Sequence, residues 1–416
     1  MELSELRTQS LEQLQELAKT YKVRNAMQLS KEDLKRAIMI QLARAGKLVF
    51  DGGVLEILPD GYGFLRSSNG LPERNDTYVS PSQIKRFGLR DGDTITGVIR
   101  APKNDERYFA LVKVEAVNGA PPEQSRRRPN FRELTPLHPS ELLSLEHDPT
   151  DVSTRIIDLF CPIGKGQRGL IVSPPKAGKT TLLKQIARGI NANHPDVKLF
   201  VLLVDERPEE VTDFSRSIDA GEVVAATFDQ EPRHHTRIAE LVTNRAKRLV
   251  EMGQDVVILM DSITRLARAY NLSVPSSGKL LSGGMDPTAL YKPKEFFGAA
   301  RNIEEGGSLT IIATALVDTG SKLDQVVFEE FKGTGNMELI LDRNLSNKRV
   351  YPAIDVEQSG TRKEELLVPA KVLNRVWILR KMMSNLNDTQ QALEFVKSKM
   401  EATKDNEQFL ELMSSD

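Results

Sequence analysis

The chain has 416 residues, with 57 lysines and arginines against 58 aspartates and glutamates, and its net charge is −1. This balance excludes a uniformly basic nucleic-acid coat, although it is compatible with a local basic groove. At roughly 150 residues per domain, the length predicts about three structural units. The single cysteine, Cys161, excludes an internal disulfide, and the five scattered histidines leave no zinc spacing. No apolar run is long enough to span a bilayer and the amino terminus lacks an apolar signal core, so we expect a soluble cytoplasmic protein.

Residues 1–47 are predicted to form a helical bundle. Leu11, Leu14 and Leu17 recur at helical spacing, and Ser30 with Asp33 three residues later is typical of a helix start. Two interpretations remain open for this segment. It is either a bundle that only packs on its neighbour or a helical nucleic-acid-binding module.

Residues 48–118 change character and predict a small closed barrel of the OB type. Short β-rich runs, separated by Asp-Gly and other glycine-containing turns, occupy 54–58, 61–65, 94–99 and 108–112. Residues 119–133 hold three prolines and the basic run 126–128, and they are predicted to be a linker.

From residue 134 to residue 416 the pattern predicts an α/β domain with a helical C-terminal tail. Helical stretches such as 180–192 and 236–252 alternate with apolar runs that read as buried strands. This alternation indicates a mostly parallel sheet covered on both faces. The predicted strands are 169–173, 199–205, 223–228, 256–261, 309–315 and 337–341.

A phosphate-binding loop is predicted where the first of these strands meets the next helix. Backbone N–H groups at such a helix start hold phosphates, and the lysine of the motif reaches the β- and γ-phosphates. The first glycine of the usual pattern is Ser173 here, which removes backbone freedom at one position. The expected ATP-binding residues are Pro174, Pro175, Lys176, Ala177, Gly178, Lys179, Thr180 and Thr181.

Two carboxylates follow the next strands of the predicted sheet. Asp261 ends a hydrophobic strand, as a Walker B acid does, and with the Thr180 hydroxyl it is expected to hold Mg²⁺. Glu206 ends the strand after the phosphate-binding loop, where it can orient and deprotonate an attacking water. The sequence therefore predicts ATP hydrolysis, with ATP and Mg²⁺ as cofactors.

Long runs of the sequence resemble the family of bacterial transcription termination factors called Rho. The runs include LIVSPPKAGKTTLL, VLLVDERPEEVTD, ILMDSITRLARAYN and SGTRKEELL, with DGYGFLRS in the predicted barrel. The resemblance implies a homohexameric ring of RecA-like motors with cold-shock-like barrels. Such a ring is an RNA-dependent ATPase and helicase that moves 5′ to 3′ on cytosine-rich RNA. It releases transcripts from RNA polymerase and meets elongation factors such as NusG.

The resemblance also implies two RNA sites. Tyr62 and Phe64 alternate on a strand, so both rings face one side of the barrel, where aromatic rings stack single-stranded bases. A carboxylate such as Asp76 can accept from cytosine N4, and Arg66 can donate to the opposite edge of the base. In the pore, Lys279 and Lys322 lie in loops similar to the family's Q and R loops. The implied primary-site residues are Tyr62, Phe64, Arg66, Asp76, Tyr78, Glu106, Arg107 and Tyr108.

The remaining implied residues surround the ATP site. Arg362 matches the family's arginine finger, which acts across a subunit boundary, and Arg207 and Arg265 match further active-site arginines. Tyr351 matches the aromatic side chain that stacks on adenine. Arg349 is a further candidate without an assigned role.

Two alternative functions are open at this point. Another RecA-like ring, such as a rotary ATPase subunit, predicts a barrel without exposed aromatic side chains. A passive RNA-binding chaperone needs only residues 48–118 and leaves the phosphate-binding loop unexplained.

Overall fold

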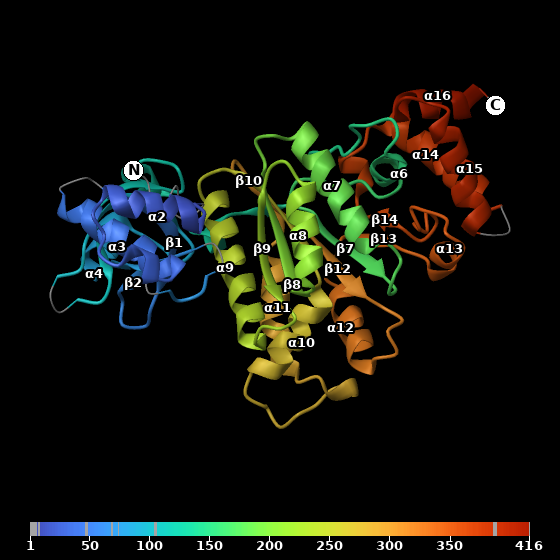
Figure 1. Cartoon of the computed structure of the whole chain (residues 1–416). Coiled ribbons are helices and arrows are strands. Elements are labelled where there is room, and N and C mark those ends of the chain that lie inside the picture. Colours follow the sequence, from blue (N-terminus) through green and yellow to red (C-terminus); the bar gives the residue numbers. More distant parts are fainter. Residues whose placement is uncertain are drawn as a thin grey trace. The chain divides into compact units, whose positions relative to one another are not determined.

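A computed structural model describes residues 6, 9–45, 49–67, 70–73, 75–103, 106–385 and 389–415 (Figure 1). The chain forms two compact units. The first comprises Met1–Phe131 with Thr243–Met252, and the second comprises Arg132–Val242 with Gly253–Asp416. The expected boundary between residues 47 and 48 lies outside the described residues.

The first unit begins with two α-helices, α2 (Leu11–Thr20) and α3 (Lys31–Arg44), joined through the short 3-10 helix Ala26–Gln28. Helix α2 starts with a capping box, because the Ser10 side chain accepts from Gln13 N–H and the Gln13 side chain accepts from Ser10 N–H. Ser30 caps α3 in a similar way, accepting from the backbone N–H of Asp33 at 3.2 Å. The predicted helical pair in this segment is therefore present.

A closed barrel of strands in the order β1-β2-β3-β5-β4 makes up the rest of the first unit. Inward-facing Leu55, Leu65, Ile95 and Phe109 are almost fully buried and share one hydrophobic cluster with the helices. Helix α4 (Pro81–Phe87) follows β3. The strands are β1 (Val49–Ile57), β2 (Gly63–Arg66), β3 (Thr77–Val79), β4 (Thr94–Arg100) and β5 (Phe109–Val117).

The segment 119–133, expected to be a linker, contains ordered structure. It forms helix α5 (Pro122–Arg127) and the 3-10 helix Phe131–Glu133. Arg128 is buried and pairs with Asp93 at 2.6 Å and with Glu251 at 3.1 Å. A buried charge is tolerated only when it is paired, so these contacts fix the backbone at Arg128.

The second unit is built on a sheet with the path β14-β13-β7-β12-β10-β8-β9. Strands β13, β7, β12, β10, β8 and β9 pair in parallel along this path, and only β14 at the edge runs antiparallel. Each of the six predicted strands is present, in this order along the chain: β7 (Arg168–Ser173), β8 (Lys198–Glu206), β9 (Glu222–Thr227), β10 (Asp255–Asp261), β12 (Ser308–Leu316) and β13 (Met337–Ile340). The α/β fold class is confirmed.

Helices cover this sheet because its strands are apolar on both faces. Alternate residues of β8 (Leu199, Val201 and Leu203) join one cluster with helices α6 and α7, while Phe200 and Leu202 are buried as well. Figure 1 shows α7 and α8 in front of the strands. The helices are α6 (Val152–Phe160), α7 (Lys179–Asn193), α8 (Pro208–Ser217), α9 (Pro232–Val250), α10 (Ile263–Ser273), α11 (Tyr291–Gly298), α12 (Lys322–Lys332) and α13 (Arg343–Asn347). Short strands β6 (Pro136–Leu137), β11 (Arg301–Ile303) and β14 (Gly360–Thr361) complete the sheet.

The C-terminal segment is helical as predicted, with α14 (Ala370–Met383), α15 (Thr389–Glu401) and α16 (Asn406–Ser415) gathered together in Figure 1. Arg155 of α6, whose side chain is fully buried, fastens the turn between α15 and α16. It donates to the backbone carbonyls of Met400, Thr403 and Asp405 at 2.8, 2.9 and 2.7 Å. In the described part of the chain, no helix combines the length and apolarity that a membrane crossing requires.

Candidate functional site

The phosphate-binding loop lies at the carboxyl end of β7 and leads directly into α7. Lys176 and Gly178 take positive φ angles of 67° and 92°, which turn consecutive backbone N–H groups toward one concave surface. At Gly178 a side chain would face the Tyr351 ring at 3.7 Å, so the conformation rather than space favours glycine. This loop opens a pocket of about 1010 Å³.

Lys179 lies between the two carboxylates that the sequence singled out. Its ammonium pairs with Asp261 and, at 3.1 Å, with Glu206. The Thr180 hydroxyl lies 3.3 Å from the Asp261 carboxylate, which also accepts from Thr314 at 2.7 Å. The parallel register explains this meeting, because β7, β8 and β10 present their carboxyl ends at the same edge of the sheet.

A β-bulge aims Glu206 into the site. The pairing of β8 with β9 shifts register between Val204 and Glu206, and the intervening Asp205 has a φ of 59°. Arg265 of α10 secures the bulge by donating to the carbonyl of Asp205 and lies 3.5 Å from Glu206. Bulges of this kind redirect a side chain next to an active site.

Burial and neighbouring charges shift the pKa values of Glu206 and Lys179. Burial and then the nearby Asp261 charge raise the pKa of Glu206 above its usual value. Burial alone would lower the pKa of Lys179, but Asp261 and Glu206 outweigh it and raise that pKa. The lysine therefore stays charged, while Glu206 is poised to take up a proton at a higher pH than an ordinary glutamate.

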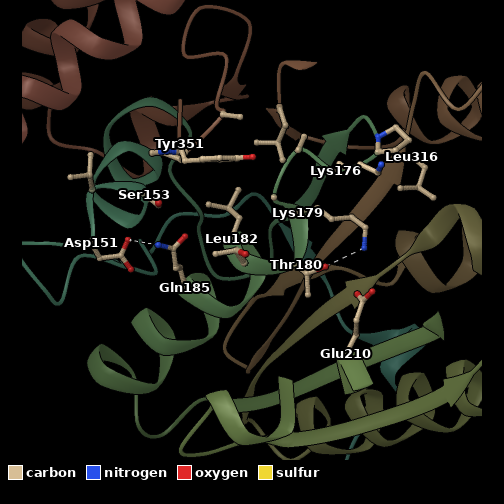
Figure 2. A pocket seen from close by; sticks show the side chains of 18 of the residues that line it. Asp151, Ser153, Lys176, Lys179, Thr180, Leu182, Gln185, Glu210, Leu316 and Tyr351 are labelled. Carbon is tan, nitrogen blue, oxygen red and sulfur yellow. Dashed lines mark hydrogen bonds between the residues drawn. The ribbon is translucent and has the colours of Figure 1, made fainter. Parts of the chain in front are cut away.

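The end of the pocket away from Lys179 is lined by the predicted Tyr351 and by further side chains that sequence reasoning missed. Figure 2 shows Tyr351 and Ser153 there, with Asp151 accepting a hydrogen bond of 2.9 Å from Gln185. Lys397 of α15 donates to the Tyr351 carbonyl at 3.1 Å, and Glu401 lies on the same wall. The pocket lining includes the predicted ATP-binding residues except Pro174. Asp261, which was predicted to hold Mg²⁺, is also absent from the lining, although it pairs with Lys179.

The four arginines predicted around the ATP site differ in whether they line the nucleotide pocket. Arg265 and the exposed Arg207 line the pocket, whereas Arg349 and Arg362 are exposed elsewhere. Arg362 follows β14, whose Thr361 pairs with Met337, and Met337 pairs with Gly169 near the amino end of β7. At about 3.3 Å per residue, the run from Arg168 to Ser173 separates Arg362 from its own phosphate-binding loop by roughly 17 Å.

The barrel brings four of the predicted RNA-binding residues to one pocket. A cavity of about 580 Å³ is lined by Tyr78, Glu106, Arg107 and Tyr108. The same lining includes Arg100, which sequence reasoning missed and which holds Glu106 through bonds of 2.5 and 2.8 Å. This pairing lowers the pKa of Glu106 to about 2.

An aromatic cluster adjoins this pocket, with Phe64 at its centre. The Phe64 ring centroid lies 5.8 Å from Tyr62, 6.1 Å from Tyr78 and 4.8 Å from Tyr108. The alternation of Tyr62 and Phe64 thus places both rings on one side of the barrel. Phe64 is only 8% exposed, while Tyr108 is 38% exposed. Phe109 is fully buried in the barrel core.

Arg66 and Asp76 are engaged with each other beside this cluster. Both side chains are buried, Arg66 also pairs with Glu56 at 2.6 Å, and its guanidinium lies 4.8 Å over the Phe64 ring. Burial raises the pKa of Asp76 in spite of the hydrogen bond from Glu73 N–H and the charge of Arg66. Contact of these two side chains with a base stays a prediction.

The loop that carries the exposed Lys279 lies beside the start of α12, whose first residue is the exposed Lys322. A side chain on Gly283 would meet the backbone N of Leu323 at 2.4 Å, so only glycine allows this approach. The start of α12 is held to α10, because Arg268 donates to the buried Asp324 through two bonds of 2.7 and 2.6 Å. Thr319 donates to the same carboxylate at 2.7 Å.

Comparisons with known proteins match both units. A family model described as the Rho termination factor RNA-binding domain matches residues 51–123. A second, the nucleotide-binding domain of the ATP synthase alpha/beta family, matches residues 153–361. Solved structures share the fold at low identity. An ATPase from a type III secretion system has a TM-score of 0.57 at 22% identity, covering 68% of this chain and 86% of its own.

Curated relatives match along nearly the whole chain. The transcription termination factor Rho of Aquifex aeolicus is 56% identical, covering 99% of this chain and 95% of the relative. That of Bacillus subtilis is 56% identical, covering 100% and 96%. The Rho RNA-binding match separates the chain from a rotary ATPase subunit, and the nucleotide-binding match separates it from a passive RNA chaperone. With an RNA-binding domain and an ATPase-type nucleotide-binding domain in one polypeptide, the chain belongs to the transcription termination factor Rho family.

Proposed function

We propose that the chain is an RNA-dependent ATPase and helicase that moves 5′ to 3′ along cytosine-rich RNA as a homohexameric ring. In this role it ends transcription in the cytoplasm by releasing RNA from RNA polymerase, in contact with elongation factors such as NusG. The observation that carries the proposal is that Lys179, in the nucleotide pocket, pairs with both Glu206 and Asp261, in a chain whose barrel has its own aromatic pocket.

The pocket residues divide the chemistry of ATP hydrolysis among them. Lys179 and the N–H groups at the start of α7 bind the phosphates, and Tyr351 offers its half-exposed ring to the base. Glu206, aimed by the bulge, orients a water and accepts its proton as the water attacks the γ-phosphate. Arg265 holds the bulge and adds positive charge beside the reacting phosphate.

The Thr180 hydroxyl and Asp261 carboxylate oxygens, 3.3 Å apart, are the hard oxygen ligands that Mg²⁺ accepts together with nucleotide phosphates. The ion would neutralise charge on the β- and γ-phosphates. Within the described chain, no three or more His, Cys, Asp or Glu side chains gather to hold a metal by themselves. This fits an ion that arrives with the nucleotide.

Arg362 completes the site of the neighbouring subunit. Its place near the amino end of β7 leaves it too far from its own phosphate-binding loop, while its exposure leaves it accessible to a neighbour. Its guanidinium would stabilise the charge that builds up during phosphoryl transfer. Trans action requires a neighbouring subunit, and the proposed ring supplies one at every interface.

The test is ATP turnover with and without poly(C) RNA. RNA should stimulate the wild type. Lys179→Ala should lose both nucleotide binding and turnover, while Glu206→Gln should bind ATP and lose turnover. Glu209→Gln is the matched control, because Glu209 is an exposed acid outside the pocket. Near-normal RNA-stimulated turnover in Glu206→Gln would refute the assignment.

A further inference from the structure

Asn336 occupies the position between β7 and the segment that carries Arg362. Its backbone N–H donates to the Arg168 carbonyl, and its own carbonyl accepts from Arg362 N–H, both at 2.9 Å. Its side-chain oxygen accepts from Arg168 N–H at 2.9 Å and from the Gln167 side chain at 2.6 Å. A single residue thus joins the start of β7 to the backbone of the arginine.

Gln167 makes this connection rigid. Its side chain is fully buried, donates to both the side-chain oxygen and the carbonyl of Asn336, and accepts from Gly164 N–H at 3.2 Å. Removal of the Asn336 side-chain oxygen would leave the Arg168 N–H and one Gln167 donor without their acceptor. Buried donors that lose a partner pull the local structure out of place.

The opposite flank of Arg362 is fixed as well. The Thr361 hydroxyl donates to the Pro162 carbonyl at 2.7 Å, and Arg380 donates to the Ser359 carbonyl at 3.0 Å. The backbone at Arg362 is therefore held by contacts from Asn336 and from the preceding residues, while its side chain stays exposed.

Three arginines, Arg168, Arg301 and Arg362, concentrate positive charge around the Arg362 segment. Arg168 donates to the carbonyls of Thr334 and, at 3.2 Å, Ala300, so its guanidinium is held by neutral groups. Burial and then the charges of Arg301 and Arg362 lower the pKa of Arg168. The three cations repel one another, so a firm backbone is needed to keep Arg362 directed outward rather than displaced by its neighbours.

We propose that Asn336 is a positioning residue for Arg362, and that its side-chain amide sets the geometry with which Arg362 reaches the triphosphate of the next subunit. The inference rests on the proposed trans action of Arg362. Displacement by about 1 Å from a productive position can cost about a hundredfold in rate. Loss of the Asn336 amide should therefore lower hydrolysis about tenfold to a hundredfold without touching nucleotide binding.

The first measurement is single-turnover ATP hydrolysis by Asn336→Ala in the presence of RNA, together with the Kd for ATP. The rate should fall as stated while the Kd stays within about twofold of wild type. Asn193→Ala is the matched control, because that side chain also makes two hydrogen bonds, to the Ser144 and Glu146 carbonyls, away from the pocket. A rate within about twofold of wild type in Asn336→Ala would overturn the proposal.

The second measurement determines whether Asn336→Ala impairs the ATP site of its own subunit or that of the neighbouring subunit. Asn336→Ala subunits keep their own phosphate-binding loop, and Lys179→Ala subunits keep their own Arg362. Rings mixed from the two, verified by differential tags, should recover hydrolysis at interfaces that join the intact halves. A purely structural role of Asn336 would damage its own pocket through β7, and the mixed rings would then stay inactive. Addition of Asn336→Ala to Arg362→Ala should cause no further loss, and an additional loss would count against positioning.

Rings mixed from Arg362→Ala and Lys179→Ala subunits separate positioning by Asn336 from trans action by Arg362. If they recover and the Asn336→Ala mixture does not, positioning by Asn336 is wrong and trans action of Arg362 stands. If neither recovers, trans action fails and the inference fails with it. Should Asn336→Ala not assemble, Asn336→Leu keeps the branching without the acceptor. Failure of both to assemble would show that Asn336 holds the fold rather than the arginine.

Discussion

Tyr108 should contribute more to RNA affinity than Phe64, because it is the ring that a base can reach. A tyrosine side chain has about 200 Å² of surface. Its 38% exposure corresponds to about 75 Å² that a stacked base would cover, worth about 2 kcal/mol at about 25 cal/mol per Å². Tyr108→Ala should therefore weaken binding about 25-fold, within the range expected for one stacked base.

Phe64 offers far less surface to a base. At 8% exposure it presents about 16 Å², which corresponds to about 0.4 kcal/mol and about a twofold change in Kd. Phe64→Leu preserves most of the cluster's volume and so tests this direct contribution. Its larger effect should be on stability, because Phe64 contacts Tyr62, Tyr78 and Tyr108.

The assay is fluorescence anisotropy with a short oligocytidine at one fixed salt concentration, since phosphate contacts make every affinity salt-dependent. Tyr291→Ala is the control, because Tyr291 is 68% exposed and belongs to the second unit. An unchanged Kd in Tyr108→Ala, combined with a loss above tenfold in Phe64→Leu, would show that bases approach a different face of the barrel.

Two further predictions concern pH and stability. Since the pKa of Glu206 is raised, the single-turnover rate should fall with decreasing pH already above the range of an ordinary glutamate; a flat profile down to pH about 4.5 in folded protein would contradict its role as base. Arg155→Met should lower the free energy of unfolding of the second unit by about 3–5 kcal/mol, because buried acceptors around α15 and α16 lose their donor. Urea unfolding and limited proteolysis measure this change, and release of the C-terminal helices should precede global unfolding; equal resistance to both would show that the remaining contacts suffice.

The sequence predicted the parts of the fold that depend on local patterns. The phosphate-binding loop is continuous in sequence, and the apolar strands before Glu206 and Asp261 are strong signals, so their meeting at one sheet edge could be anticipated. The helix start at Ser30 was also predicted from neighbouring residues, whereas the capping box at Ser10, an equally local signal, was missed.

Features that depend on distant pairing could not be predicted. The position of Arg362 near the amino end of β7 requires the antiparallel pairing of β14, a strand of only two residues. Lys397 and Glu401 reach the ATP pocket because α15 packs against α6, and nothing near either residue signals a ligand. The burial of Phe64 depends on rings from two distant segments, those of Tyr78 and Tyr108.

The wall of the nucleotide pocket that Lys397 and Glu401 form has a consequence for synthesis of the protein on the ribosome. Lys397 and Glu401 line the nucleotide pocket together with Lys179, but they are translated long after it. Because N-terminal parts of a chain emerge and fold first, the phosphate-binding loop leaves the ribosome before its opposite wall exists. A nascent chain should therefore hold ATP weakly until α15 has emerged. The ribosome thereby delays the completed pocket until nearly the whole motor is made.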